Sequence, residues 1–309
     1  MIRAAYLAAE GFETPLAEEL GRRGATITGW HGRLALSPDP PVPAAWALDV
    51  WLDPREIAVP SIKAGADALR ALQRNWAGYP VDHHRRSALI AERLPPVRAR
   101  PIVFPAAAPT AHLGAWTLLT PETMLASPTK TSPFINGECL FAEDRAGPPN
   151  RAYLKLWEVL CRLRRWPAAG DRCLDLGASP GGWTWVLASL GARVTAVDRA
   201  PLDPRVAALP GVEERQESAF ALAPEPVDWL VCDVIAYPDR LLALVHRWVE
   251  ARAAGTIICT IKFQGATDHA AAEAFAAVPG GQVMHLFHNK HELTFVWSAD
   301  ATGSRSGPA

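Results

Sequence analysis

A glycine-rich segment in the second half of the chain has the residue types that a cofactor-binding loop requires. The segment Asp175-Leu-Gly-Ala-Ser-Pro-Gly-Gly-Trp183 follows an apolar run and precedes a helical pattern. Its glycines, Gly177, Gly181 and Gly182, permit a tight turn and a close approach of backbone to ligand. A helix that begins near Gly182 also presents free N–H groups to a bound molecule. The segment therefore predicts a cradle for a cofactor.

An acid follows this loop at the end of the next apolar run, Arg193-Val-Thr-Ala-Val197, where the next residue is Asp198. A carboxylate at this place can accept hydrogen bonds from both hydroxyls of a ribose. NAD and S-adenosylmethionine both contain such a ribose. The dinucleotide fingerprint G-x-G-x-x-G is absent, because Gly177, Gly181 and Gly182 have a different spacing, and this disfavours a dehydrogenase.

Lysine is scarce in this chain. Of 31 basic residues, 26 are arginines, and the lysines are Lys63, Lys130, Lys155, Lys262 and Lys290. An ammonium group is compact and can release a proton, whereas a guanidinium group effectively cannot. The lysines are therefore candidates for positions where the chemistry requires an ammonium.

The elements that must position these residues alternate between strand and helix over residues 151–300. Short apolar runs predict strands at 172–176, 193–197, 229–232, 256–261, 283–287 and 294–297. Helical patterns lie between them at 182–190, 239–252 and 267–277. This alternation predicts an α/β domain with a Rossmann-like, mostly parallel sheet and helices on both faces, with ligands at the carboxyl ends of the strands. Residues 301–309 read as a frayed tail.

Residues 1–120 predict a smaller α+β domain. Strand-like runs at 2–8, 46–52 and 116–119 accompany helical patterns at 14–24 and 61–73, with a hairpin around Gly32. Residues 121–150 are rich in Ser, Thr, Pro and Gly and predict a linker or loop before the second domain.

Charge limits the possible contacts with nucleic acid. The chain has 31 Lys+Arg against 32 Asp+Glu, so binding to RNA or DNA has to be local rather than carried by an overall basic excess. Residues 83–100 contain seven basic side chains and one acid, Glu92. This stretch is either a solvated face or the electrostatic footprint of an RNA partner. We also hypothesise that the loop around Lys130 touches an RNA backbone.

Five cysteines without a C-x-x-C pair predict buried free thiols rather than disulfides or structural zinc. No run approaches the ~20 apolar residues of a membrane-spanning helix, and the N-terminus does not resemble a signal peptide. We expect a cytoplasmic protein that requires no metal, contacts no membrane and needs no obligatory protein partner.

The segment 175–183 resembles the methyl-donor loop of the FtsJ-like ribose 2′-O-methyltransferases. Members of that family carry a Lys-Asp-Lys-Glu tetrad, and the same residue types occur here in the same order: Lys155, Asp233, Lys262 and Glu292. A closer resemblance is to the bacterial RlmM-type enzymes, which methylate a cytidine ribose of 23S ribosomal RNA. It extends to Gly11-Phe12-Glu13, Ser132-Pro133-Phe134 and Leu154–Leu156, and is fuller after residue 152 than before residue 120.

The resemblance implies a function and a set of roles. Lys262 would be the base or proton acceptor for the ribose 2′-hydroxyl or would stabilise the developing alkoxide, while Asp233 and Glu292 orient Lys155 and Lys262. S-adenosylmethionine would be the cofactor, and its implied contacts are Asp175, Gly177, Ser179, Pro180, Gly181, Gly182, Trp183, Asp198, Ser218 and Asp233. The family tends to have an acid where this chain has Ser218. The first domain would correspond to a THUMP-like RNA-binding region that is shorter than in the family.

Two alternatives stay open. A methyltransferase of the same fold could act on another RNA, such as tRNA or an mRNA cap. A non-catalytic RNA-binding or ribosome-assembly factor could keep the fold, although the complete tetrad disfavours this. Taken singly, Lys155 could extend along an apolar helix face and Asp233 could cap a loop.

Overall fold

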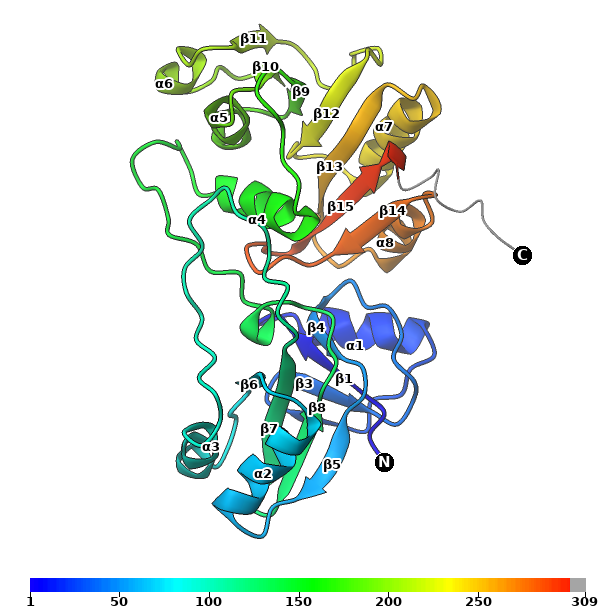
Figure 1. The fold of residues 1–309 in the computed structure, drawn as a ribbon. Coiled ribbons are helices and arrows are strands. Elements are labelled where there is room, and N and C mark those ends of the chain that lie inside the picture. The colour runs from blue at the N-terminus through cyan, green and yellow to red at the C-terminus, as the bar shows by residue number, and fades with distance from the viewer. Residues whose placement is uncertain (301–309) are drawn as a thin grey trace, which may run out of the picture. The chain divides into compact units, whose positions relative to one another are not determined.

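The computed structural model describes residues 1–300, which divide into two compact units (Figure 1). The N-terminal unit comprises Met1–Val103 and Ala108–Phe141, and the C-terminal unit comprises Phe104–Ala107 and the chain from Ala142 on. The predicted tail, residues 301–309, lies outside the described residues. No helix within residues 1–300 is long and apolar enough to cross a membrane.

The N-terminal unit begins with an antiparallel sheet of strand order β2-β3-β1-β4. Its fully buried central strand is β1 (Ala4–Ala8), flanked by β3 (Leu34–Ser37) and β4 (Ala47–Trp51), with β2 (Gly29–His31) at the edge. Helix α1 (Glu13–Arg22) buries Leu16 and Leu20 from one face, because apolar residues four apart share one side of a helix.

A second sheet in this unit has the order β5-β8-β7-β6. Its strands are β5 (Arg55–Ala58), β8 (Thr123–Ser127), β7 (Gly114–Thr120) and β6 (Trp76–Gly78). Helices α2 (Ile62–Leu72) and α3 (His84–Ala91) bury apolar side chains in a core with Trp76, Trp116 and Met124. The Ser61 hydroxyl caps α2 by accepting a hydrogen bond from the backbone N–H of Ala64 at 3.1 Å.

The boundary between the units differs from the one predicted. Residues 121–150 are not a linker throughout, because β8 pairs with both β5 and β7 and the short helix η1 (Ile135–Gly137) belongs to the N-terminal unit. Turn-forming residues on both sides of β8 conceal a five-residue strand whose last four residues are buried. The N-terminal unit is α+β as predicted.

The C-terminal unit is built on a seven-stranded sheet of order β11-β10-β9-β12-β13-β15-β14. The first five strands in this order, whose bounds are Val212–Gln216, Arg193–Asp198, Arg172–Leu176, Val227–Cys232 and Ala254–Lys262, run parallel. Strands β15 (Glu292–Ser298) and β14 (Gly281–Met284) complete the sheet in antiparallel pairings. The strand order reverses between β9 and β12, which is where ligands bind in open α/β sheets.

Helices cover this sheet in two groups. Helix α4 (Tyr153–Leu163) packs against α5 (Gly182–Ser189), and α7 (Pro238–Glu250) packs against α8 (His269–Ala276) (Figure 1). The predicted strands and helices of this half are confirmed with shifted ends. Strand β11 and helix α6 (Pro204–Ala207) were not predicted, because β11 is a polar edge strand, Val-Glu-Glu-Arg-Gln, without an apolar run.

Candidate active site

The four residues of the predicted tetrad lie together at one edge of the C-terminal sheet. Lys155 is on α4, Asp233 follows β12 directly, and Lys262 is the last residue of the neighbouring strand β13. Glu292 begins β15, where the antiparallel register places it opposite Lys262. Two parallel strands thus bring Asp233 and Lys262 to the same edge, and antiparallel β15 starts where β13 ends.

Asp233 is the centre of this cluster. The Lys155 Nζ atom donates to both carboxylate oxygens of Asp233, at 2.9 and 3.0 Å, and the Lys262 Nζ atom lies 3.0 Å from Oδ1. Burial alone would raise the pKa of Asp233, but the positive charges of Lys155 and Lys262 and the hydrogen bonds they donate outweigh it and lower that pKa. Asp233 is therefore held as a carboxylate.

The two lysines differ in their free hydrogen-bonding capacity. Lys155 is buried, and its ammonium group contacts both oxygens of Asp233 and also Glu292 Oε1 at 3.2 Å. Lys262 donates to the side chain and to the backbone carbonyl of Asp233, and its side chain is 21% exposed. An ammonium has three donors, so one position on Lys262 has no partner within residues 1–300. Lys262 is the member of the tetrad able to meet a substrate hydroxyl.

The turn that delivers Glu292 depends on buried polar residues that were not predicted. Glu158, fully buried one turn after Lys155 on α4, accepts hydrogen bonds from the backbone N–H groups of Phe287 and His288, both at 3.1 Å. Asn289 donates to the carbonyl of Glu292 at 3.0 Å. In the sequence, Glu158 stands out as a carboxylate within the apolar helix pattern 153–161. A charge buried in such a pattern requires partners, and this could have indicated its structural role.

Another buried side chain supports the same turn. Burial lowers the pKa of His285 to about 4, so its ring is neutral at pH 7. Its Nε2 atom lies 3.0 Å from the carbonyl oxygen of Lys290, which can only accept, so this nitrogen carries the proton. The exposed Lys290 side chain is two residues from Glu292, and none of the tetrad contacts described above involves it.

Gly177 makes the sharp turn that ends β9. Its φ angle of +76° lies in the left-handed region, and a Cβ atom there would lie 2.6 Å from Val234 Cα. No other residue type fits this position, because both the conformation and the space require the absence of a side chain. The loop after β9 thus passes directly against the segment that follows Asp233.

Beside this turn is a cavity of about 160 Å³ at the carboxyl ends of β9, β10 and β12. Predicted residues Gly177, Asp198 and Ser218 line it. The Asp198 carboxylate accepts one hydrogen bond from the Ser179 N–H at 3.1 Å and one from the Ala200 N–H at 3.0 Å. Each carboxylate oxygen keeps a further acceptor site, so this residue can also bind hydroxyl groups.

Further residues of the cavity wall were not predicted. The guanidinium of Arg240 lies over the ring of Phe220, 3.9 Å from its centroid, and both residues line the cavity. Val234 and Ile235 line it from the segment after Asp233, and the Ile235 side chain is exposed. The apolar residues Val234 and Ile235, directly after the candidate catalytic acid Asp233, are the sequence signal that could have identified this wall.

The remaining predicted cofactor contacts lie outside the cavity lining. Gly181 precedes α5 with a φ of +114° and packs against Val206, while Gly182 packs against Asn150. The carbonyl of Pro180 accepts a hydrogen bond from the Asp203 N–H. These residues shape the turn from β9 into α5, and their contact with a cofactor stays a prediction.

Trp183 and Asp175 are buried beneath the loop. The indole N–H of Trp183 donates to the carbonyl of Ala152 at 2.9 Å, and Lys155 Nζ lies 5.9 Å from the Trp183 ring centroid. Asp175 accepts a hydrogen bond from the Thr184 hydroxyl at 2.6 Å, and burial raises the pKa of this acid to about 7. These contacts join α4, β9 and α5 beside the tetrad.

The N-terminal unit places Lys130 differently from the hypothesis. Its ammonium is buried, 2.7 Å from Asp49 Oδ2, and also donates to the carbonyls of Ser132 and Phe134. Lys130 therefore holds its own loop together and is not exposed to an RNA backbone. The predicted buried, free state of the cysteines is confirmed. Residues 1–300 hold no cluster of three or more His, Cys, Asp or Glu side chains arranged for a metal ion.

A mostly parallel sheet with a glycine turn after its first strand, an acid after its second and a cavity at the reversal of strand order is the arrangement of a Rossmann-like domain. Residues 148–292, close to half of the chain, match the family model described as FtsJ-like methyltransferase, so this region is similar to that domain.

Curated relatives carry the name ribosomal RNA large subunit methyltransferase M. The protein from Halorhodospira halophila is 38% identical over 155 residues, which are 47% of this chain and 46% of the relative. The one from Alkalilimnicola ehrlichii is 37% identical over 171 residues, 51% and 48% of the two chains. The one from Azoarcus is 44% identical over 108 residues, 33% and 30% of the two chains. The matched region thus spans about half or less of each relative's length.

Proposed function

We propose that this protein is an S-adenosylmethionine-dependent RNA methyltransferase that transfers a methyl group to a ribose 2′-hydroxyl, with a cytidine of 23S ribosomal RNA as its target. The observation that carries this proposal is the paired cluster of Lys155, Asp233, Lys262 and Glu292 at the sheet edge where the cofactor cavity lies. The FtsJ-like domain and the names of the relatives support the same reaction. Such a function belongs in the cytoplasm.

The cavity fits the adenosine part of S-adenosylmethionine. Asp198 would accept hydrogen bonds from the two ribose hydroxyls, and Gly177 and Val234 would form the wall beside them. Ser218 and Phe220 would lie against the adenine from the far wall. A Cβ atom at position 177 would meet the Val234 backbone, so the glycine keeps the turn closed against this segment while its own backbone lines the cavity.

When bound, S-adenosylmethionine supplies an electrophilic methyl group, which needs little activation. The protein's task is to align the 2′-oxygen with that group and to take up the hydroxyl proton. Lys262 does the second, because one position on its Nζ atom has no protein partner within residues 1–300, and a neutral amine can direct its lone pair to the hydroxyl there. To accept a proton it has to be in its neutral form at that moment.

Asp233 and Glu292 set the direction of the two amines. Asp233 anchors Lys262 through both a side-chain and a backbone contact, which fixes the position of Nζ. Lys155 and Glu292 pair with each other and complete the shell around Asp233. Two cations thus face two carboxylates, and a proton on Lys262 is stabilised when it arrives.

A methyl-transfer assay tests the proposal. Purified protein is incubated with methyl-labelled S-adenosylmethionine and 23S ribosomal RNA from cells that lack the gene, and labelled 2′-O-methylcytidine is measured after nuclease digestion. The parent protein is expected to transfer label, Lys262→Ala to lose it by about 10²-fold or more, and the exposed-lysine control Lys63→Ala to retain it. Undiminished transfer by Lys262→Ala would contradict the assigned role.

The role of the N-terminal unit and the identity of the RNA are finer points of the same proposal. The N-terminal α+β unit would act as a THUMP-like RNA-binding region, supported by its seven basic residues between positions 83 and 100. A target in another RNA is distinguished by the same assay with tRNA in place of ribosomal RNA. Transfer to tRNA alone would identify that alternative.

A further inference from the structure

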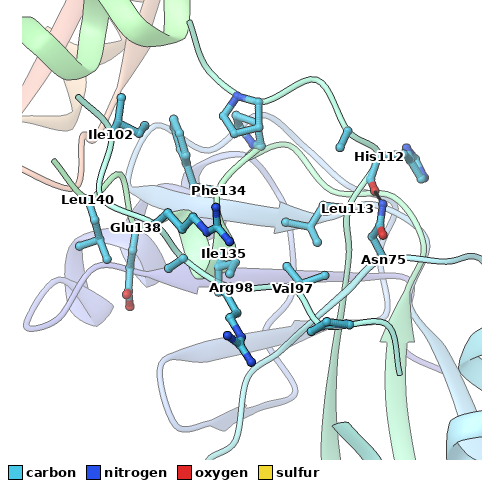
Figure 2. A pocket seen from close by; sticks show the side chains of 16 residues that line it. Asn75, Val97, Arg98, Ile102, His112, Leu113, Phe134, Ile135, Glu138 and Leu140 are labelled. Carbon is cyan, nitrogen blue, oxygen red and sulfur yellow. Dashed lines mark hydrogen bonds between the residues drawn. The ribbon is translucent and has the colours of Figure 1, made fainter. Parts of the chain in front are cut away.

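The N-terminal unit contains a cavity of about 300 Å³ that is separate from the tetrad and from the cofactor cavity (Figure 2). Three segments surround it: residues 96–102 after α3, residues 109–113 before β7, and residues 133–140 around η1. Its volume is at the lower end of the range for small-ligand sites, which is about 300–1,000 Å³. A single nucleotide is a ligand of this scale, whereas a helix or a duplex requires an open groove.

Hydrogen bonds hold the walls of this cavity in place. The backbone N–H of Ile102 donates to the carbonyl of Leu140 at 2.8 Å, which joins the first segment to the third. The Asn75 side chain donates to the carbonyl of His112 at 3.1 Å, and the carbonyl of Asn75 accepts from the Gly114 N–H at 3.0 Å. The space is therefore a built feature of this unit and not a gap between unconnected loops.

The lining joins an apolar middle to a cationic rim. Figure 2 shows Leu113, Phe134, Ile135 and Val97 in the central part, with His112 and Asn75 at one end. Three prolines, Pro96, Pro109 and Pro133, add rigid apolar surface. The charged side chains of the lining are Arg98, Arg100 and Glu138.

The rim charge indicates an anionic ligand. Arg98 and Arg100 are exposed and contrast with the single half-buried acid Glu138, in a chain whose overall charge is −1. The arginines also continue the basic stretch that begins at His83, in which Arg85 and Arg93 are exposed as well. Proteins that bind single-stranded nucleic acid combine these two elements, a cationic track for phosphates and a surface on which bases pack.

We propose that this cavity binds one unpaired nucleotide of the RNA, with the base against the apolar lining and the adjoining phosphates at Arg98 and Arg100. The inference rests on the proposed function, because it takes the ligand to be part of the RNA substrate. It assigns to the N-terminal unit a nucleotide-sized site in addition to a general electrostatic surface.

Filling the cavity tests the proposal. Ala99 and Ala111 line the cavity and are exposed, so Ala99→Leu/Ala111→Leu adds three carbons at each position without disturbing the core. Binding of the full-length protein to a fluorescein-labelled single-stranded 23S ribosomal RNA fragment is measured by anisotropy at several salt concentrations. The matched control is Ala71→Leu/Ala91→Leu, which adds the same bulk at exposed positions outside the cavity.

The two halves of the site give different signatures. The cavity-filling variant is expected to bind the RNA about tenfold more weakly with an unchanged salt dependence, because it removes base packing and no phosphate contact. The Arg98→Ala/Arg100→Ala variant is expected to bind more weakly and with a weaker salt dependence. The slope of log K against log salt should decrease in magnitude by about 1.4, because each of two phosphate contacts contributes about 0.7. Arg85→Ala changes affinity less than either.

Equal RNA affinity of the cavity-filling variant and the parent would overturn the proposal, even if the arginine variant is weakened, since the rim would then be only a surface charge patch. A cavity that captures a peptide instead of RNA gives the same overturning result. The Lys262→Ala background separates this inference from the proposed reaction: methyl transfer is lost there, and adding the cavity-filling substitutions should still weaken RNA binding about tenfold. Cavity-dependent RNA binding without methyl transfer by the parent would refute the reaction and leave the site standing.

Discussion

Replacing Lys130 by Met is expected to destabilise the N-terminal unit strongly, because it leaves the buried carboxylate of Asp49 without its partner. The Lys130 and Asp49 side chains are 1% and 0% exposed, with Nζ and Oδ2 2.7 Å apart. Removing one partner of a buried ion pair costs about 3–5 kcal/mol. The carbonyls of Ser132 and Phe134 would also lose a donor, which places the loss within or above this range.

The pH dependence gives this prediction a second signature. Burial raises the pKa of Asp49, and the charge of Lys130 opposes that rise. Without Lys130 the pKa of Asp49 in the folded protein rises further above its unfolded value, so the folded variant binds this proton more tightly. The loss of unfolding free energy caused by Lys130→Met is therefore smallest below the pKa of Asp49 in the unfolded chain, about 3.9. It grows as the pH increases through the pKa of Asp49 in the folded variant.

Hydrogen exchange across a urea series is the suitable assay, because peptides from residues 47–51 and 130–134 report the N-terminal unit separately from the rest of the chain. Lys63→Met, an exposed lysine on α2, is the matched control and should leave the midpoint unchanged. The double variant Asp49→Asn/Lys130→Met should regain part of the loss. A parental midpoint for Lys130→Met, together with a smaller salt dependence of RNA binding, would refute the reasoning and restore Lys130 as an RNA contact.

Further predictions concern the C-terminal unit. Asp233→Asn should lower single-turnover methyl transfer by about 10²-fold or more, because it removes the charge that orients Lys155 and Lys262; a parental rate would contradict this. Gly177→Ala should weaken S-adenosylmethionine binding by calorimetry about tenfold, since a side chain at φ +76° is strained and meets Val234; unchanged affinity would place the cofactor elsewhere. Glu158→Gln should lower kcat and leave the KM for the cofactor nearly unchanged. If Glu158 acts through Glu292, the same substitution should cause no further loss of kcat in a Glu292→Gln background.

The C-terminal half was predictable because its signals are local and periodic. Apolar runs separated by helical patterns specify the order of strands and helices, and the carboxyl ends of parallel strands bring Asp233 and Lys262 to one edge without knowledge of any contact. The resemblance to the FtsJ-like family identified the partners on α4 and β15, which spacing alone does not give. The pairing of Lys155 with Glu292 confirms that these residues lie together.

The errors arose where a residue's role depends on distant partners. Lys130 lies in a loop of hydroxyl residues and prolines, a composition typical of an exposed segment. Its side chain is nevertheless buried and pairs with Asp49, which lies on a strand 81 positions earlier in the chain. Glu158 supports the turn before Glu292 through contacts across about 130 residues of chain. Strand β8 cannot be distinguished from linker in the sequence, because a short strand between turn residues has too few positions to establish a period of two.

The central claim is most directly tested by mapping 2′-O-methyl groups on 23S ribosomal RNA at nucleotide resolution in cells that lack the gene, complemented with the parent, with Lys262→Ala or with Lys63→Ala. The account predicts that one cytidine loses its methyl group in the deletion, regains it with the parent and with Lys63→Ala, and stays unmethylated with Lys262→Ala. A methylation map that does not change on deletion, or full restoration by Lys262→Ala, would contradict it.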